Sequence, residues 1–241
     1  MTLIKEKTIG EMVAEDYRTA SVFKSFGIDF CCKGNRTLDE VCESNNLSAT
    51  QVKDDLKKAT TTDETSGSAY HTWPIDLLTD YIEKKHHRYV EKTTPELKAY
   101  LEKICRVHGS NHPELFEIEK QFSSSAGELA AHMKKEELVL FPYIRKMIKT
   151  IASGETLPPP QFGKIENPVE MMMQEHTTEG DRFRKIAELS NNYTPPTDAC
   201  NTYKVTFALL KEFEEDLHLH IHLENNILFP KAIATEHQMR G

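Results

Sequence analysis

Two stretches of the sequence pair a histidine with a glutamate four residues later, and both end on Leu-Phe-Pro. The first stretch contains His132 and Glu136, and the second contains His220 and Glu224. Each of the two residues recurs after 88 positions, from 132 to 220 and from 136 to 224. Residues four apart on a helix lie on one face, so each pair can direct an imidazole and a carboxylate at one point. Both groups are ligands for transition metals.

Each of these stretches is preceded by another histidine at a similar interval. His87 lies 45 residues before His132, and His176 lies 44 residues before His220. The part of the chain that carries these motifs therefore consists of two similar halves, each with one helix that carries a histidine and one that carries His-x-x-x-Glu. Four imidazoles and two carboxylates are more ligands than one tetrahedral zinc uses, so the set predicts two metal ions. The spacing does not choose between His87 and its neighbour His86.

Two irons fit this set of ligands. If each iron takes two imidazoles and both glutamates bridge the irons, each has four protein ligands, and one oxo or hydroxo bridge makes five. Iron accepts six ligands, which leaves a position for dioxygen, nitric oxide or peroxide. A single His-x-x-x-Glu pair is usually a solvated polar pair. Two copies in register, each followed by an apolar run, favour the metal. The predicted ligands are His87 or its neighbour His86, together with His132, Glu136, His176, His220 and Glu224.

Other polar residues near these positions have weaker patterns. Glu128 precedes His132 by four residues, and Glu175 is next to His176. Either is a candidate partner that holds an imidazole or relays protons, although a solvated glutamate is the commoner case. His218 and His222 alternate with His220, and we expect both at the surface.

Two adjacent cysteines, Cys31 and Cys32, lie in the run Asp29-Phe-Cys-Cys-Lys-Gly34. Adjacent cysteines rarely form an unstrained disulfide, and two thiols alone do not complete a metal site. The neighbouring Gly34-Asn35 predicts a turn after a helix, where a thiol near a helix N-terminus would have a lowered pKa suited to a redox or metal-transfer role. Packing of one thiol in the core is the alternative.

The elements that carry these residues are predicted to be helices. After residue 73 apolar residues recur every three or four positions, no convincing strand pattern is present, and prolines separate the segments. We expect long helical segments at about 75–108, 114–150, 167–191 and 197–235. Four helices around one core indicate an all-α fold, a four-helix up-down bundle.

The first part of the chain forms a separate small helical domain in this interpretation. Residues 1–58 contain three capping boxes, at Thr8, Thr37 and Ser48, which predict three short helices. Gly27 is expected to end the first helix or helix pair. Residues 59–73 are rich in Thr, Ser, Asp and Gly and are predicted to be a flexible linker, and residues 74–241 form the bundle.

Composition limits the partners. The 241 residues include 38 acidic and 30 basic side chains, for a net charge of −8, which disfavours a nucleic-acid partner. We find no apolar stretch long enough to span a membrane and no signal-peptide core at the start. Five cysteines do not indicate a disulfide framework at this size. These features favour the cytoplasm.

With these motifs together, the sequence resembles the iron-sulfur cluster repair di-iron proteins, a family also called regulator of cell morphogenesis and NO signalling. The N-terminal part is similar to the small domain of that family through Asp29 to Gly34 and the following Thr37-Leu38. The remainder is similar to its hemerythrin-like domain through the run His86-His87-Arg88-Tyr89, through Glu175-His176 and through the two His-x-x-x-Glu stretches.

The resemblance implies a hemerythrin-like bundle in which His87, rather than His86, ligates an oxo- or hydroxo-bridged di-iron centre. The positions matching His132, His176 and His220 also ligate iron, and those matching Glu136 and Glu224 bridge the irons. Reversible dioxygen carriage is disfavoured. The implied function is the repair of iron-sulfur clusters damaged by nitric oxide or peroxide during stress.

Several alternatives stay open from the sequence. The protein could donate iron to a damaged cluster, or act as an oxidoreductase on nitric oxide or nitrite. A non-catalytic sensor that binds O2 or NO at the irons is the main rival, and a zinc-stabilised scaffold is a third. The expected partners are damaged iron-sulfur proteins and the small ligands NO, O2 or nitrite, and the family resemblance leaves a homodimer open.

Overall fold

The computed structural model describes residues 7–61 and 70–240, and its regular elements are helices. The only pairing of strand type within these ranges is an isolated β-bridge between Thr8 and Thr37. The predicted all-α class is therefore confirmed. Contacts divide the chain into two compact units, Thr79–His220 and Met1–Leu78 with Ile221–Gly241, and the two boundaries fall within helices α5 (Ile75–Tyr81) and α10 (Asn201–Leu223).

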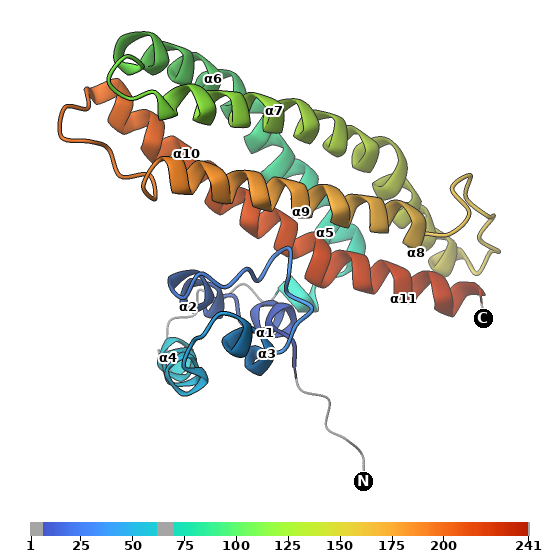
Figure 1. Ribbon diagram of the computed structural model, residues 1–241. Coiled ribbons are helices and arrows are strands. Elements are labelled where there is room, and N and C mark those ends of the chain that lie inside the picture. The colour runs from blue at the N-terminus through green and yellow to red at the C-terminus, as the bar shows by residue number, and fades with distance from the viewer. Residues whose placement is uncertain (1–6, 62–69, 241) are drawn as a thin grey trace. The chain divides into compact units, whose positions relative to one another are not determined.

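The unit of residues 79–220 is built from long helices that share one core (Figure 1). Helix α7 (Glu114–Lys135) packs against both α6 (Arg88–His108) and α9 (Glu166–Leu189). Helix α10 (Asn201–Leu223) completes the core through its Phe213. The ring of Phe213 lies 5.3 Å from that of Phe122 on α7 and 5.6 Å from that of Phe183 on α9, measured between centroids.

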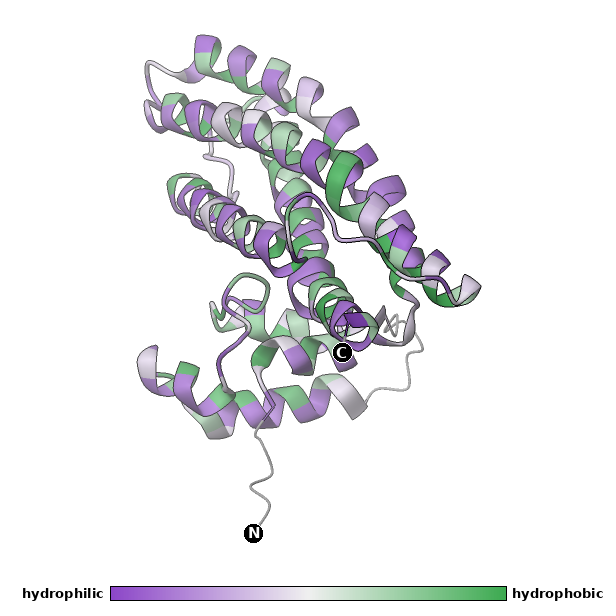
Figure 2. Ribbon diagram, turned by 90° about the vertical axis from the view of Figure 1, so that its right-hand side faces the viewer, coloured by the Kyte–Doolittle hydropathy of each residue, from purple (hydrophilic) through white to green (hydrophobic). Residues whose placement is uncertain are grey.

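The helices of both units are amphipathic, and hydrophobic and hydrophilic residues alternate along each ribbon in Figure 2. In α6 and α7 the apolar residues spaced by three and four are the buried ones, such as Leu97, Leu101 and Ile104. The four helical segments predicted from this period are present. They are continuous at 75–108, 114–153, 166–189 and 201–240.

Three of these segments contain a single π-helical turn, which helix periodicity does not predict. The turns are η2 (Ile82–His87) between α5 (Ile75–Tyr81) and α6, η3 (Glu136–Leu140) between α7 and α8 (Phe141–Ser153), and η4 (Glu224–Leu228) between α10 and α11 (Phe229–Arg240).

The last two turns have a cause in the repeated Leu-Phe-Pro tripeptide. Pro142 and Pro230 have no backbone N–H and cannot continue the α-helical hydrogen-bond ladder. The preceding amides of Phe141 and Phe229 donate instead to the carbonyls of Glu136 and Glu224, five residues back.

Residues 7–61 form four helices where three were predicted. They are α1 (Ile9–Glu15), α2 (Thr19–Ser25), α3 (Leu38–Ser44) and α4 (Ala49–Thr61). The chain breaks after α1 because the carboxylate of Asp16 accepts hydrogen bonds from the backbone and the guanidinium of Arg18. The capping boxes at Thr8 and Thr37 are confirmed, and Gly27 has a φ of +66° just after α2, as expected for a helix end.

Part of the predicted linker has regular structure. Residues 59–61 complete α4, and Tyr70–Thr72 form a 3-10 turn in which Tyr70 is buried. Residues 62–69 of the predicted linker lie outside the described residues. The predicted boundaries 1–58, 59–73 and 74–241 stay a prediction.

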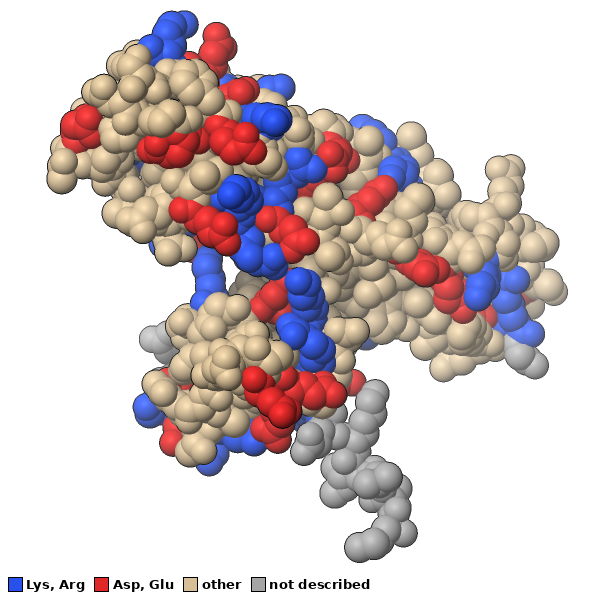
Figure 3. Space-filling view, viewed as in Figure 1, with Lys and Arg blue, Asp and Glu red and all other residues tan. Residues whose placement is uncertain are grey.

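Charges of both signs are mixed on the face shown in Figure 3. Exposed ion pairs such as Lys53 with Asp39 and Lys84 with Asp80 occur in both units. Among the described helices, we find none that combines the length and the apolar character needed to cross a membrane.

Candidate metal centre

The six predicted ligands are all buried, with at most 3% of each residue exposed. Their donor atoms form two groups in which all atoms lie within 4.8 Å of one another. One group contains His87 and His220, the other contains His132 and His176, and both include Glu136 and Glu224. Glu224 follows His220 by one helical turn on the same continuous helix.

The π turns lie where the ligands are. His87 is the last residue of η2, and Glu136 and Glu224 are the first residues of η3 and η4. A π turn inside an α-helix is often associated with a functional site, because it changes the direction of the side chains around it.

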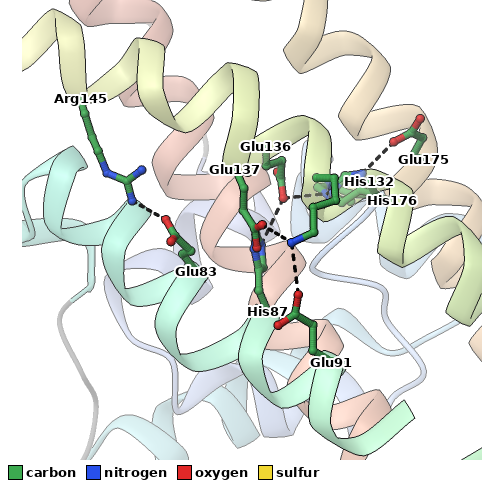
Figure 4. Close-up of polar contacts among 10 residues, drawn as sticks. Glu83, His87, Glu91, His132, Glu136, Glu137, Arg145, Glu175 and His176 are labelled. Carbon is green, nitrogen blue, oxygen red and sulfur yellow. Dashed lines mark hydrogen bonds and ion pairs between the residues drawn. The ribbon is translucent and has the colours of Figure 1, made fainter. Parts of the chain in front are cut away.

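The carboxylate of Glu136 lies between the two groups (Figure 4). Its Oε2 atom is 3.3 Å from His87 Nε2 and 3.4 Å from His132 Nε2. His176 Nε2 in turn lies 3.1 Å from His132 Nε2. The Nε2 atoms of three histidines from three helices therefore converge around one carboxylate.

In two of the imidazoles, Nδ1 contacts a carboxylate, and that carboxylate forms an ion pair with a lysine. His132 Nδ1 lies 2.7 Å from Glu175 Oε2, and Lys135 forms an ion pair with the same glutamate. The hydrogen bond from His132 is the largest cause that lowers the pKa of Glu175 to about 2. A carboxylate on Nδ1 fixes the proton there and leaves the Nε2 lone pair free for a metal.

His87 has the same kind of support. Its Nδ1 lies 3.0 Å from Glu137 Oε1, and Lys134 bridges Glu137 to Glu91 at 2.6 and 3.3 Å (Figure 4). Burial works to raise the pKa of Glu137, but its hydrogen bonds with Lys134 and His87 outweigh burial, so the pKa is lowered. Consecutive lysines at the end of α7 thus serve the two halves of the site.

The His132 half of the site borders a pocket of about 130 Å³ in the unit of residues 79–220. Its lining residues are Glu128, Leu129, Ala131, His132, Lys135, Glu175, His176 and Glu179. This volume accommodates water or a diatomic molecule.

The donor set fits two divalent metals of the iron type. Four imidazoles and two carboxylates, buried and arranged in two overlapping groups, match the nitrogen and oxygen ligands of first-row transition metals. The Nε2 atoms of His132 and His176 lie 3.1 Å apart in this buried site, close enough for both to bind one cation when neither nitrogen carries a proton.

A third group of potential ligands lies in the unit that includes the N-terminus: Asp29, Cys31 and Cys32. The two thiol sulfurs are 3.5 Å apart, and Asp29 Oδ1 accepts hydrogen bonds from Cys31 Sγ at 3.4 Å and from the amide of Cys32 at 2.9 Å. Cys31 is buried, and its hydrogen bond with Cys32, together with burial, raises its pKa well above the usual value.

Residues of η4 hold this cysteine loop within the same unit. Asn225 Nδ2 donates to the carbonyl of Cys31 at 3.0 Å, and Asn226 Nδ2 donates to that of Phe30 at 3.1 Å. The approach is close at Gly10, where an added Cβ would lie 2.2 Å from Asn226 Oδ1. The loop therefore attaches to the turn that begins with Glu224.

The other candidates have mixed positions. Glu175 contacts His132, whereas Glu128 lines the pocket with a side chain that is 57% exposed and pairs with Arg182 at 2.7 Å. The expectation that His222 lies at the surface is wrong. It is fully buried between the rings of Tyr17 and Phe30, and burial lowers its pKa to about 3. His218 is partly exposed.

Sequence reasoning missed Glu137, Lys134 and Asp216. Glu137 and Lys134 support His87, and Asp216 Oδ2 lies 3.0 Å from His86 Nδ1. Asp216 precedes His220 by four residues, so its spacing placed it near the ligands, but nothing in the sequence pointed to its contact with His86.

Family models match most of the chain. Residues 79–232 match the hemerythrin HHE cation binding domain, and residues 5–60 match the ScdA_N domain, which is described as of unknown function. The fold and site are thus those of a hemerythrin HHE protein with an N-terminal ScdA-type domain.

Whole-chain relatives define the family more narrowly. The chain is 32% identical to the iron-sulfur cluster repair protein YtfE of Musicola paradisiaca (strain Ech703), over 96% of this chain and 98% of the relative. It is 32% identical to YtfE of Yersinia pestis (strain Pestoides F), over 96% and 99%, and 27% identical to the iron-sulfur cluster repair protein ScdA of Staphylococcus haemolyticus (strain JCSC1435), over 95% and 99%. The chain belongs to this family of iron-sulfur cluster repair proteins.

Proposed function

We propose that the protein holds two iron ions between its four histidines and two shared glutamates, in an oxo- or hydroxo-bridged centre, and uses them to repair damaged iron-sulfur clusters. The observation that carries this proposal is the pair of overlapping, buried donor groups that share Glu136 and Glu224. The names of the relatives, which describe iron-sulfur cluster repair, support the second part.

The residues of the chain prepare the site for a metal. Glu137 and Glu175 orient the imidazoles of His87 and His132, so that each Nε2 presents its lone pair to the centre. Phe141 stacks on His87 at 5.6 Å between ring centroids and keeps water from that side. Bound iron would supply redox chemistry and exchangeable coordination positions.

Two versions of the repair use the same donors. In the first, iron is the cargo, and it passes to a damaged cluster because thiolate and sulfide hold iron more strongly than imidazole and carboxylate do. In the second, the pocket beside His132 and His176 would admit NO, nitrite or O2, and bound iron would supply the redox chemistry with electrons from a separate reductant. The second version makes the protein an oxidoreductase.

We further propose that Cys31 and Cys32 pass iron to the damaged cluster. Their sulfurs and Asp29 form a group of three potential ligands, and adjacent cysteines are poorly placed for an unstrained disulfide, which favours metal transfer over thiol oxidation. Metal binding would release the thiol proton that the raised pKa of Cys31 retains at neutral pH. Unimpaired repair by C31S/C32S would overturn this role.

The first experiment is the metal content of the purified full-length chain, measured by elemental mass spectrometry. About two irons per chain, lost in Glu136→Ala, would support the centre, and a repair assay on an NO-treated [4Fe-4S] enzyme would follow. Zinc alone, or no metal after anaerobic incubation with ferrous iron, would overturn the di-iron proposal.

A sensor is the second candidate, and one observation favours it. Asn225 and Asn226 connect the cysteine loop to η4, the turn that begins with Glu224, so a change at Glu224 could reach the loop. A sensor should change the hydrogen exchange of the loop when NO binds and should release no reduced product. Product formation with an unchanged loop would reject it.

The proposed location is the cytoplasm, where damaged iron-sulfur proteins would be the partners. Sedimentation of the full chain with and without iron would test for a homodimer, which the family resemblance leaves open.

A further inference from the structure

His86 is completely buried, but only one of its ring nitrogens has a hydrogen-bond partner among the described residues. Nδ1 lies 3.0 Å from Asp216 Oδ2, and Nε2 has no partner in that part of the chain. Buried polar atoms are nearly always satisfied in native proteins, so an exception requires a reason such as an ion or a functional role.

The imidazole of His86 has the same kind of carboxylate contact as His87 and His132, which face the proposed centre. Asp216 holds its Nδ1 as Glu137 holds that of His87 and Glu175 holds that of His132. In each case the carboxylate fixes the proton on Nδ1, and Nε2 keeps a lone pair that can bind a metal. These three imidazoles therefore have a carboxylate on Nδ1, and only two of them, His87 and His132, are among the four histidines of the proposed centre.

The ring of His86 lies beside the centre. It stacks on His220, with centroids 5.4 Å apart and planes inclined by 12°. It is absent from both groups of converging donor atoms, whereas its neighbour His87 belongs to one of them. In the conformation described, His87 occupies the ligand position and His86 lies behind His220.

The π turn η2 supplies a way to exchange the two. Both histidines lie at its end, and a π turn is an α-helix with one extra residue. Successive residues of an α-helix are rotated by about 100°, so one residue of register decides which side chain faces the centre. If the extra residue moved beyond His87, His86 would take the direction that His87 now has.

The helix after η2 favours such a shift. Pro95 lies inside α6 and has no N–H for the carbonyl of Glu91, four residues back. The hydrogen-bond ladder is therefore already interrupted one turn beyond His87, where a displaced π turn would lie.

We propose that His86 and His87 are alternative ligands for the metal bound by His220, Glu136 and Glu224, exchanged by a one-residue shift of η2. This inference rests on the proposed metal centre. Exchange would let the turn change register while the metal stays bound, because the imidazole of His86 takes the place of the outgoing imidazole of His87.

The test compares variants of the full-length chain loaded anaerobically with ferrous iron or, separately, with Co2+ alone. His87→Ala has a neighbouring histidine that can replace it, whereas the neighbours of His132, Ala131 and Met133, offer none. We expect His87→Ala to keep two metals per chain with affinity about tenfold weaker. His132→Ala should lose one metal, and the double variant H86N/H87A should lose one as well.

Asparagine at position 86 keeps a donor for Asp216, and circular dichroism of the metal-free variants checks that each one folds. Two metals in the wild type but equal losses in His87→Ala and His132→Ala would overturn this inference alone. Fewer than two metals in the wild type would overturn the proposed function as well.

A second measurement uses chelator-driven metal release, which does not depend on repair activity. His86→Asn should release its metal faster than the wild type, because no second imidazole recaptures the metal when His87 dissociates. Equal release rates would contradict the exchange. In the Co2+ protein, the absorption spectrum of His87→Ala should change again when His86→Asn is added, and an unchanged spectrum would also count against it.

Discussion

The two halves of the proposed metal centre share one arrangement but differ in what surrounds them. In each half a carboxylate, Glu137 or Glu175, holds an imidazole, and a lysine of α7 pairs with that carboxylate. The His132 half borders a pocket of about 130 Å³. The His87 half is instead packed against Phe141 and adjoins the additional buried imidazole of His86.

From this difference we infer that the two proposed metal positions have different roles. A half beside a pocket is suited to a small molecule that arrives from solvent, because its metal can be reached without moving the helices. The half enclosed by the ring of Phe141, with the second imidazole of His86 beside it, is suited to retain a metal and transfer it. The shared carboxylates couple the two tasks.

The largest effect is expected where the halves meet. Glu136→Ala removes a ligand from both donor groups, so the metal content should fall from about two ions towards none, whereas His176→Ala affects one group and should leave about one. Elemental analysis of both variants decides this. Glu128→Ala, which changes an exposed carboxylate at the pocket, is the control and should keep both metals. Equal losses in Glu136→Ala and His176→Ala would show that Glu136 does not join the halves.

The carboxylates behind the imidazoles should have the next largest effect. Glu175→Gln and Glu137→Gln should each weaken one of the two metal sites by about 10- to 100-fold, since they no longer fix the imidazole proton on Nδ1. Stepwise titration with Co2+ resolves the two sites. We expect Glu175→Gln to lower the affinity for NO more than Glu137→Gln does, because the half that contains Glu175 borders the pocket. Indistinguishable NO affinities would argue against different roles for the two positions.

A change at the pocket should affect access without affecting metal. Ala131→Trp places a large side chain at the lining of the pocket, and Ala130→Trp on the same exposed part of α7 is the matched control, because Ala130 is not among the lining residues. Stopped-flow measurement of NO binding to the ferrous protein should be slowed only in the first. If both variants bind NO as the wild type does, ligands enter elsewhere.

Much of this arrangement follows from sequence patterns of fixed period. The His-x-x-x-Glu repeat predicted the donors because four residues make one helical turn, and the prolines separated the helices because they lack an N–H. The structure brings all six predicted donors together. The capping boxes at Thr8 and Thr37 correctly predicted two helix starts, because a capping box is a local hydrogen-bond motif within four residues.

The features that the sequence did not predict depend on contacts between distant segments or on broken periodicity. His222 was assigned to the surface because it alternates with His220, but the rings of Tyr17 and Phe30, some 200 residues earlier, bury it. Glu137 supports His87 across 50 residues. The π turns change the register at the ligands themselves, which a fixed period of 3.6 cannot describe.

The smallest expected effect concerns stability, and it has opposite signs in the two halves. Glu179 lines the pocket, is 3% exposed, and accepts a hydrogen bond from Ser125 at 2.5 Å. Burial raises its pKa above the usual 4.5, although Ser125 and Arg182 act in the other direction. The pKa of Glu137 in the other half is lowered.

A carboxyl whose pKa is raised by folding stabilises the protein below its unfolded value, and this contribution is lost as the pH rises through the folded value. Glu179→Gln should therefore gain stability over the wild type as the pH rises above about 4.5. For Glu137 the sign is reversed. Its contribution is present above the unfolded value and lost as the pH falls through the lowered one, so Glu137→Gln should be less stable than the wild type at neutral pH and approach it in acid. Thermal unfolding of the metal-free proteins at pH 4 to 8 measures both differences. If they have the same sign, the charge environments of the two halves are alike, and the pocket does not set them apart.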